Sequence, residues 1–485
     1  MRASILWLMA LPGLAAGLGE RIDSLLRSGG AAGPAFWGIH VVDAVTGESL
    51  YERNADQLFV PASNVKLFTT ALALARLGPE FRFQTVVRTE AQPDQAGRLT
   101  GNLWLYGGGD PTLSGRDYPY RKRATAGDPL RGIEELADRV AAQGVHRIEG
   151  DIIGDDSLYP WEPYPPGWTQ GDSLWDYGAP VSALTLNDNT IWLTVRPGTR
   201  AGVPAILSLR PAVEYYVVHN QVQTVERPGG RVVIERVPGA RELRVSGQIA
   251  LSDPGQTYAL ALDDPARYAA AALAEALVRR GIFIRGRPRA WHASTPDAGV
   301  QPPVELGRRL SPALTEILRV INKESQNLHA ELVLRAVAQV CSGSGTRRAG
   351  LEEMRRFLGE VGLPEGVCRL EDGSGLSRRN LVTPRAVTQL LVFMYNGPYR
   401  DIWTGLLPVG GEDGTLQDRF RNVPEGRSIR AKTGTLASSS ALSGYAETPR
   451  GQVLAFSILV NNHAADTSEV RGLIDRISIV IAQGG

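Results

Sequence analysis

The sequence pattern changes from helical to β-like and back to helical along the chain, and this alternation constrains the fold more than any other feature. A strongly helical pattern, with Leu67 and Leu74 on one face, precedes residues 81–289. Those residues consist mainly of short β-like runs that Gly, Pro and Asp separate, and helical patterns return after residue 290. Because helical parts flank a β-rich stretch, we expect one α+β domain that a large, mostly β insertion interrupts.

The two ends of the chain predict the sheet of this split domain. Residues 36–54 read as two strands around a turn, and residues 427–447 read as two neighbouring strands. Another apolar run follows over residues 451–462, and a final amphipathic helix is expected to begin near Asp466. This order fits an antiparallel sheet that the terminal helix flanks.

Length and charge narrow the classes of function. At 485 residues the chain is too long for one ordinary domain and suggests two or three. Hydrophobic residues make up 43% and charged residues 21%, which is usual for a globular protein. The formal net charge of +1 gives no electrostatic reason to expect nucleic acid as a partner. Evidence of function must therefore come from local motifs.

The N-terminus is typical of a secretory signal peptide. Arg2 precedes an apolar run over residues 5–14, and small residues follow over 15–17. A membrane anchor is the weaker alternative, because the run is shorter than the roughly 20 residues needed to span a bilayer. We expect residues 1–18 to be removed, which would leave no transmembrane segment. The mature protein would then act in the periplasm or another extracytoplasmic cell-wall space.

Cysteine and histidine give little evidence of a metal. Export would place Cys341 and Cys368 in an oxidising compartment, so a disulfide and two separate thiols are both open. No CxxC or HExxH pattern occurs, and we expect no metal or other cofactor. The triplet His329-Ala330-Glu331 resembles part of a zinc-deaminase signature, but no PCxxC follows it. An ordinary helical face is the favoured interpretation.

Three short motifs stand out because lysine is scarce. The chain holds 52 lysine and arginine residues, yet only four are lysine, and three of these lie in or beside the motifs. Each motif is weak alone, but the set in this order is a strong signal. The motifs are Ser63-Asn64-Val65-Lys66, Ser325-Gln326-Asn327 and Lys432-Thr433-Gly434. A general bias toward arginine explains why lysine is rare, but not where the remaining lysines lie.

The first motif pairs a nucleophile with a base. A serine hydroxyl is a poor nucleophile until a neighbouring base takes its proton, and no histidine here stands in a recognisable Ser-His-Asp order. Lysine can take this role because burial lowers the pKa of its ammonium group, whereas arginine stays charged in proteins. Ser63 is expected at a helix start, with Lys66 one turn along on the same side. A solvent-exposed helix lysine is the alternative.

The set resembles the S-x-x-K, S-x-N and K-T-G motifs of penicillin-binding proteins and serine β-lactamases. The closer similarity is to D-alanyl-D-alanine carboxypeptidases of the S13 peptidase family, the penicillin-binding-protein-4 type, in which a long insertion separates the first two motifs. Here that separation takes up about half of the chain. Other stretches similar to this family are spread over nearly the whole mature chain, among them YGGGDPTL, GDDSLY, YGAPVSALTLNDN, DGSGLSRRNLVTP and LLPVGGEDGTL.

The resemblance implies an exported serine DD-peptidase with a β-lactamase/transpeptidase-like domain. Ser63 would attack the carbonyl between two D-alanines of a peptidoglycan stem peptide, with Lys66 as general base. Ser325 would relay a proton to the leaving amine, and Asn327 would bind the substrate amide. The acyl-enzyme would then be hydrolysed, and β-lactam antibiotics would act as covalent inhibitors of the same serine.

The third motif is expected to bind the terminal carboxylate of the substrate. Lys432 would supply the charge, together with the hydroxyl groups of Thr433 and Thr435, and this charge would help keep the general base neutral. Backbone N–H groups of Ser63 and Thr435 would hold the negative charge that develops on the carbonyl oxygen. Gly434 belongs to the same predicted strand.

The resemblance also implies a role for the insertion. Asp156, in GDDSLY, is a candidate for binding the amino group of the stem's diamino acid, with a structural turn aspartate as the alternative. The expected boundaries place the peptidase domain at 19–85 and 290–485, an inserted domain at 86–189 and 251–289, and a nested β domain at 190–250.

Two other functions are open at this point. A serine β-lactamase or esterase would use the same motifs, but a β-lactamase turns over penicillin rapidly, whereas a peptidase stays acylated. A non-catalytic module that binds or senses peptidoglycan would release no D-alanine from a pentapeptide. The sequence leaves open the balance between carboxypeptidase, endopeptidase and transpeptidase activity.

Overall fold

Strands from the two ends of the chain form one five-stranded antiparallel sheet in the computed structural model. Its order is β19-β20-β21-β1-β2. The strands are β1 (Phe36–Asp43), β2 (Ser49–Arg53), β19 (Ile429–Leu436), β20 (Ser439–Glu447) and β21 (Val453–Asn461). The N-terminal strand β1 pairs with β21, with Phe36 opposite Asn461. This pairing joins the two ends into one domain, as the sequence predicted.

The structure describes residues 17–30, 35–122, 127–227, 229–294 and 301–484. The predicted signal peptide lies almost wholly outside these ranges, and α1 (Leu18–Ser28) is the first described element. Within the described ranges, no helix combines the length and the apolar character needed to cross a membrane.

Helices cover both faces of the terminal sheet, so its strands are buried on both sides. Along β20, Leu442 and Ala446 pack toward α1 and α10 (Thr467–Gln483), whereas Ala441 and Tyr445 pack toward the helices of the opposite face. Those helices are α2 (Val65–Leu77), α5 (Leu314–Lys323), α6 (Asn327–Ser342), α7 (Arg347–Glu360), α8 (Pro384–Tyr395) and α9 (Arg400–Leu406). The alternation follows the period of two of a β-strand. The predicted α+β class is confirmed.

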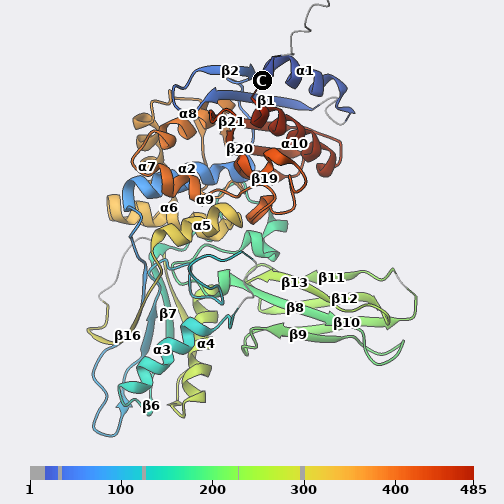
Figure 1. The fold of residues 1–485 in the computed structure, drawn as a ribbon. Coiled ribbons are helices and arrows are strands. Elements are labelled where there is room, and N and C mark those ends of the chain that lie inside the picture. Colours follow the sequence, from blue (N-terminus) through green and yellow to red (C-terminus); the bar gives the residue numbers. More distant parts are fainter. Residues whose placement is uncertain (1–16, 31–34, 123–126, 228, 295–300, 485) are drawn as a thin grey trace, which may run out of the picture.

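A second five-stranded sheet forms the inserted lobe, at the lower left of Figure 1. Its order is β15-β7-β5-β3-β16. The lobe contains β3 (Gln84–Thr89), β5 (Leu103–Tyr106), β7 (Ile152–Pro160), β15 (Pro288–Ala293), β16 (Val304–Leu310), α3 (Arg131–Ala142) and α4 (Pro265–Arg279). Three two-residue strands, β4 (Arg98–Leu99), β6 (Arg147–Ile148) and β14 (Phe283–Ile284), form a small sheet at its far end.

The chain enters this lobe through β3 and leaves it through β16. These strands pair antiparallel, with Gln84 opposite Leu310, and β15 pairs with β7. The expected return to the peptidase domain at residue 290 is therefore too early, because the pairing keeps the chain in the inserted sheet as far as Leu310. A β-like run predicts a strand, but its partner is set by contacts distant in sequence.

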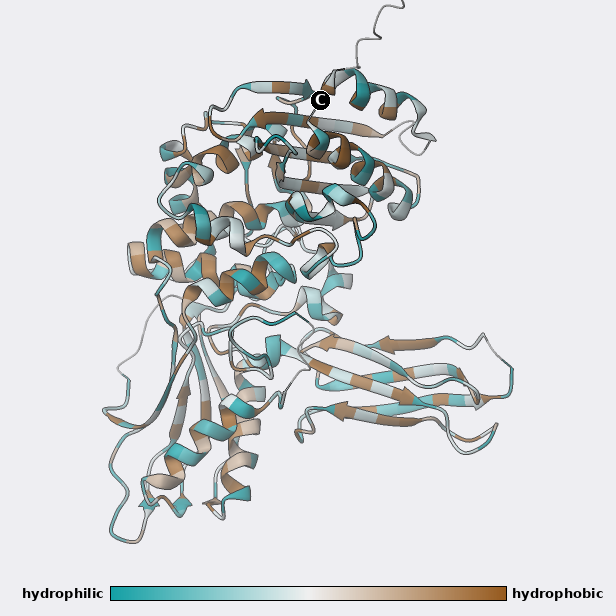
Figure 2. Ribbon diagram, viewed as in Figure 1, coloured by the Kyte–Doolittle hydropathy of each residue, from teal (hydrophilic) through white to brown (hydrophobic). Residues whose placement is uncertain are grey.

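A smaller β lobe projects to the right in Figure 1. It consists of the sheets β13-β8-β9 and β10-β12-β11. The strands are β8 (Thr190–Arg196), β9 (Ile206–Arg210), β10 (Val217–Val225), β11 (Val232–Glu235), β12 (Glu242–Ala250) and β13 (Gln256–Ala261). Figure 2 shows hydrophobic and hydrophilic residues alternating along these strands. Because β13 pairs with β8, the nested unit extends beyond the expected limit at residue 250.

The two cysteines are separate thiols in the structure. Cys341 is exposed near the end of α6, and Cys368 lies in β17 (Cys368–Arg369), which pairs with β18 (Leu381–Val382). Of the two alternatives that the sequence left open, the structure therefore has the free thiols.

Candidate active site

Ser63 lies where a short 3-10 turn, η2 (Ala62–Asn64), runs into α2. The predicted helix start is therefore displaced slightly, but Lys66 still lies one turn after Ser63. Ala62 has a left-handed φ of 49°, which a non-glycine residue adopts only when its surroundings hold it there. Ser63 is partly exposed and Lys66 is fully buried, so the hydroxyl is accessible while the amine is shielded from water.

Two glycines let neighbouring segments approach this turn closely. A Cβ atom on Gly434 in β19 would lie 2.7 Å from the Pro61 carbonyl oxygen. A Cβ atom on Gly375 would lie 1.9 Å from the Ala62 carbonyl oxygen, and Gly375 also has a positive φ of 85°. Only glycine fits at such distances. The K-T-G strand and the DGSGL loop thus both press against the segment that carries Ser63.

The amine of Lys66 joins the first two motifs. Its Nζ atom lies 3.0 Å from Ser63 Oγ, 2.6 Å from Asn327 Oδ1 and 2.6 Å from the carbonyl oxygen of Ser374. Burial lowers the pKa of Lys66 to about 7, although the charges of Asp372 and Glu331 oppose this shift. A large fraction of the amine is therefore uncharged at neutral pH and has a lone pair for the Ser63 proton.

Lys432 joins the second and third motifs. Its Nζ atom donates hydrogen bonds of 2.9 Å to Ser325 Oγ and to the carbonyl oxygen of Thr433. Ser325 has a left-handed φ of 63°. Burial is the main cause that holds the pKa of Lys432 well below its usual value, and the charge of Lys66 adds to it. For Lys66, burial is the first cause of the lowered pKa, as expected from the sequence.

The two threonines of the third motif lie on β19, at the edge of the terminal sheet. Thr433 Oγ1 donates a 2.9 Å hydrogen bond to Thr415 Oγ1, and Thr435 Oγ1 accepts one of 2.9 Å from Arg471 in α10. An edge strand has a row of backbone N–H and C=O groups that its own sheet does not pair. The structure therefore brings these hydroxyls, Lys432 and an open strand edge to one place.

A carboxylate that the motif search missed organises the loop beside Lys66. Asp372 accepts hydrogen bonds from the backbone of Gly375 and Ser377, from Asn380 Nδ2 and from Trp168 Nε1. This network fixes the loop whose Ser374 carbonyl contacts the amine of Lys66. The sequence signal was DGSGLSRRN, in which an aspartate precedes small turn residues.

Glu331 is a second buried acid near Lys66. It accepts a 2.9 Å hydrogen bond from the Gly373 backbone, and burial together with the charge of Asp372 raises its pKa to about 7. His329, two residues earlier on α6, bonds to a different acid, Asp188. The two polar residues of the H-x-E triplet therefore belong to different hydrogen-bond networks: His329 bonds to Asp188, and Glu331 bonds to the Gly373 backbone.

Asp188 anchors the second motif from the inserted lobe. In η5 (Asn187–Asn189), its carboxylate lies 2.8 Å from His329 Nε2 and 2.6 Å from Arg116 Nη2, and it accepts a hydrogen bond of 3.2 Å from Gln326 Nε2. The carbonyl oxygen of Tyr177, also in the insertion, accepts a 2.8 Å bond from Asn327 Nδ2. The insertion therefore helps to position the S-x-N motif. The sequence contained this aspartate in TLNDN but gave no sign of its partners.

Replacing Asp188 with alanine should slow acylation by a β-lactam by about 100-fold, because small displacements of reacting groups cost rates of this order. Stopped-flow labelling gives the acylation rate, and thermal unfolding shows whether each variant is folded. Asp263→Ala is a matched control, since Asp263 accepts bonds from Tyr215 and Tyr216 within the insertion. Equal slowing in both variants would show that the effect is general loss of stability.

Asp156 is engaged within the chain. It is buried in β7, where its Oδ1 lies 2.9 Å from His292 Nδ1 and its Oδ2 accepts a 2.7 Å bond from Ser182. Burial lowers the pKa of His292, but hydrogen bonds with Asp156 and Asp264 outweigh this and raise it to about 10. Since both oxygens have partners, this geometry does not support the prediction that Asp156 binds a substrate amine.

The fold and the site together define a class. An antiparallel sheet covered by helices on both faces places one Ser-Lys pair at a helix start and a second at the edge strand. Active-site serine enzymes that transfer acyl groups use this constellation to activate a hydroxyl without histidine.

The chain belongs to the D-Ala-D-Ala carboxypeptidase 3 (S13) family, whose model matches residues 18–481. The D-alanyl-D-alanine carboxypeptidase of Actinomadura sp. strain R39 is 35% identical over 465 residues, covering 92% of this chain and 81% of the relative. The predicted family and enzyme class are confirmed: the protein is a serine-type D-Ala-D-Ala carboxypeptidase.

Solved structures share the fold over nearly the whole chain. Penicillin binding protein 4 of Haemophilus influenzae superposes with a TM-score of 0.81 at 24% identity, covering 95% of this chain and 98% of that one. A second structure of the same protein, complexed with a β-lactam, has a TM-score of 0.77 at 23% identity and the same coverage. At this level of identity the likeness shows the fold.

Proposed function

We propose that the protein is exported and hydrolyses the bond between the two terminal D-alanines of peptidoglycan stem peptides through an acyl-enzyme on Ser63. The observation that carries this proposal is the fully buried Lys66 amine, 3.0 Å from Ser63 Oγ. Among the described residues no carboxylate bonds directly to this amine, and its burial favours the neutral form that a general base needs.

In the acylation step, Ser63 Oγ attacks the carbonyl carbon while its proton passes to Lys66 Nζ. The tetrahedral intermediate collapses with cleavage of the C–N bond, and the D-alanine amine leaves with a proton. Ser325, whose Oγ lies 2.9 Å from Lys432 Nζ, donates that proton and takes up the one that Lys66 received, so both groups return to their starting forms. Water then attacks the ester while Lys66 accepts a proton from it. That proton passes to Ser63 Oγ as the ester bond breaks, which releases the shortened stem peptide.

Binding groups surround this reaction centre. Asn327 holds the substrate amide, and its own amide bridges Lys66 and the Tyr177 carbonyl. Lys432, Thr433 and Thr435 on β19 receive the terminal carboxylate. That anion favours the protonated form of Lys432 and so counteracts the effect of burial. Backbone N–H groups of Ser63 and Thr435 stabilise the oxyanion.

A β-lactam is expected to acylate the same serine, because its strained amide occupies the place of the D-Ala-D-Ala bond. The β-lactam complex of the Haemophilus influenzae protein, which shares this fold, supports this expectation. Export is supported by the N-terminal pattern of the sequence, and it would bring the enzyme to its peptidoglycan substrate.

Release of D-alanine tests the proposal. Incubation with a pentapeptide stem ending in D-Ala-D-Ala should release one D-alanine per peptide, measured by D-amino-acid oxidase, while the matched peptide ending in D-Ala-L-Ala should stay intact. Penicillin should leave a stable adduct on the intact protein by mass spectrometry. Rapid loss of that adduct without peptide cleavage would favour a β-lactamase and reject the proposal.

Acylation should also depend on pH. Lys66 must be neutral to accept the serine proton, so the acylation rate is expected to be low at acid pH and to rise through pH 7, where the pKa of Lys66 lies. The rate of labelling by a penicillin between about pH 5 and 9 measures this. A flat profile across pH 7 would contradict the assignment of Lys66 as the base.

A further inference from the structure

An arginine-rich pocket lies where the chain passes between the peptidase domain and the inserted lobe. It has a volume of about 740 Å3 and is lined by residues just before β3, by the end of β16 and by α3. Five of its lining residues are arginines, namely Arg82, Arg131, Arg139, Arg308 and Arg309. The motifs of the active site contribute nothing to its lining, so this is a separate site.

Three of the five arginines have carboxylate partners. Arg309 pairs with the buried Asp110 at 2.9 Å and with Glu135 at 3.4 Å. Arg131 pairs with Asp117 at 3.0 Å, and Arg308 pairs with Glu305 at 2.7 Å. These pairs hold their guanidinium groups in place around the pocket.

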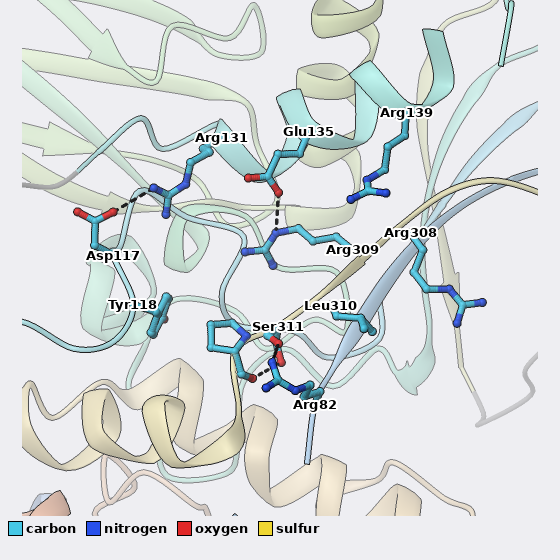
Figure 3. A pocket seen from close by; sticks show the side chains of 11 residues that line it. Arg82, Asp117, Tyr118, Arg131, Glu135, Arg139, Arg308, Arg309, Leu310 and Ser311 are labelled. Carbon is cyan, nitrogen blue, oxygen red and sulfur yellow. Dashed lines mark hydrogen bonds and ion pairs between the residues drawn. The ribbon is translucent and has the colours of Figure 1, made fainter. Parts of the chain in front are cut away.

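The other two arginines lie outside these ion pairs. Within the described part of the chain, neither Arg82 nor Arg139 has a carboxylate within 4.0 Å, and Arg82 donates only to the Ser311 carbonyl, at 2.9 Å. Figure 3 shows Arg139 on α3 and Arg82 on the opposite side of the pocket, with Arg309 between them. The two arginines outside the ion pairs therefore lie on two walls of the pocket, while Arg309 between them pairs with two acids.

We propose that this pocket binds a phosphate-bearing anion with at least two charged groups, such as a diphosphate. Guanidinium groups present paired N–H donors that match phosphate oxygens. A ligand with charged oxygens at both ends can reach two opposite walls, which one monovalent anion cannot. The volume lies within the range of small-molecule sites, and it leaves room for a group attached to the phosphates.

The position of the pocket gives binding a structural consequence. Arg82 and Ser311 lie on the two segments that connect the peptidase domain to the inserted lobe, and Arg139 lies on a helix of that lobe. A bound anion would link these elements. It would therefore stabilise the protein against unfolding, by an amount that increases with the concentration of free anion.

Titration with inorganic pyrophosphate tests the proposal. Isothermal titration calorimetry on the full mature chain, at about 0.05 M ionic strength, should show saturable binding that weakens at about 0.5 M. Two other anions are titrated at matched ionic strength. Citrate tests whether several carboxylates bind equally well, and sodium sulfate tests whether a simple dianion does. The variants Arg82→Gln and Arg139→Gln should each weaken pyrophosphate binding about tenfold. Arg348→Gln is the matched control, because Arg348 is an exposed arginine on α7 with an 85% exposed side chain.

Each outcome decides the matter. Tighter binding of pyrophosphate than of citrate or sulfate, lost in both pocket variants and kept in the control, supports the proposal. Equal binding of citrate and pyrophosphate overturns the phosphate assignment. Absence of saturable binding, or equal losses in all three variants, overturns the site. Thermal unfolding verifies that the variants are folded, and D-alanine release reports separately on the catalytic proposal.

Discussion

Replacing Ser63 with alanine should abolish covalent labelling by a fluorescent penicillin and reduce D-alanine release roughly a millionfold, as loss of the nucleophile does in other serine hydrolases. The substitution removes one oxygen from a partly exposed side chain, so it creates no buried cavity. The remaining site would still bind substrate through β19 and Asn327. Affinity for a stem peptide is therefore expected to change little while turnover disappears.

Labelling is measured by gel fluorescence and by intact mass, and D-alanine by a coupled oxidase. Ser344→Ala is a suitable control, because Ser344 lies in the loop after α6. Among the residues that the structure describes, its hydroxyl makes a single contact, of 3.5 Å, with Thr346. A penicillin adduct of full stoichiometry on the Ser63→Ala protein would show that another residue is the nucleophile.

Replacing Lys66 with arginine should lower the acylation rate by about 10³-fold, within the range of general-base contributions. A guanidinium group keeps its proton in proteins and offers no lone pair to Ser63. The site is also fully buried, so the larger side chain would strain the surrounding packing.

Lys66→Met separates these two effects, because methionine has a similar shape and no charge. Both variants should lose acylation to a similar extent, although only the arginine variant should be strongly destabilised in thermal unfolding. Normal acylation by the methionine protein would show that Lys66 has a packing role only. Lys122→Met, a lysine outside the three motifs, is the control for removing a lysine.

The sequence predicted the motif residues that the structure brings together better than it predicted the residues that support them. Motifs record local spacing, so Ser63 and Lys66 could be paired from the helical repeat alone. Asp188 acts through partners that lie far away in the sequence, as in its contact with His329. The loop that Asp372 fixes contacts the distant Lys66. Such contacts exist only once the chain is folded. The same limit explains Asp156, whose motif was visible but whose bond to His292 was not.

The sequence likewise predicted the overall division of the fold but not all the limits of its parts. Periodicity identified the split domain and the β-rich insertion, because apolar residues repeat differently in helices and strands. The C-terminal end of the insertion was misplaced, since β15 and β16 are typical strands whose assignment depends on pairing with β7 and β3. A pattern along one strand carries no information about which neighbour it joins.

The bonds from Asp188 and Tyr177 to the second motif mean that the reactive centre is built by both parts of the chain. The paired strands β3 and β16 bring the two ends of the insertion close together. The insertion could therefore be deleted and the two ends joined by a short linker. A protein without the insertion would keep all three motifs but would lose the contacts of Asp188 and Tyr177 that hold the second motif in place. Grafting these motifs onto a smaller scaffold would therefore require other residues to hold the second motif in place.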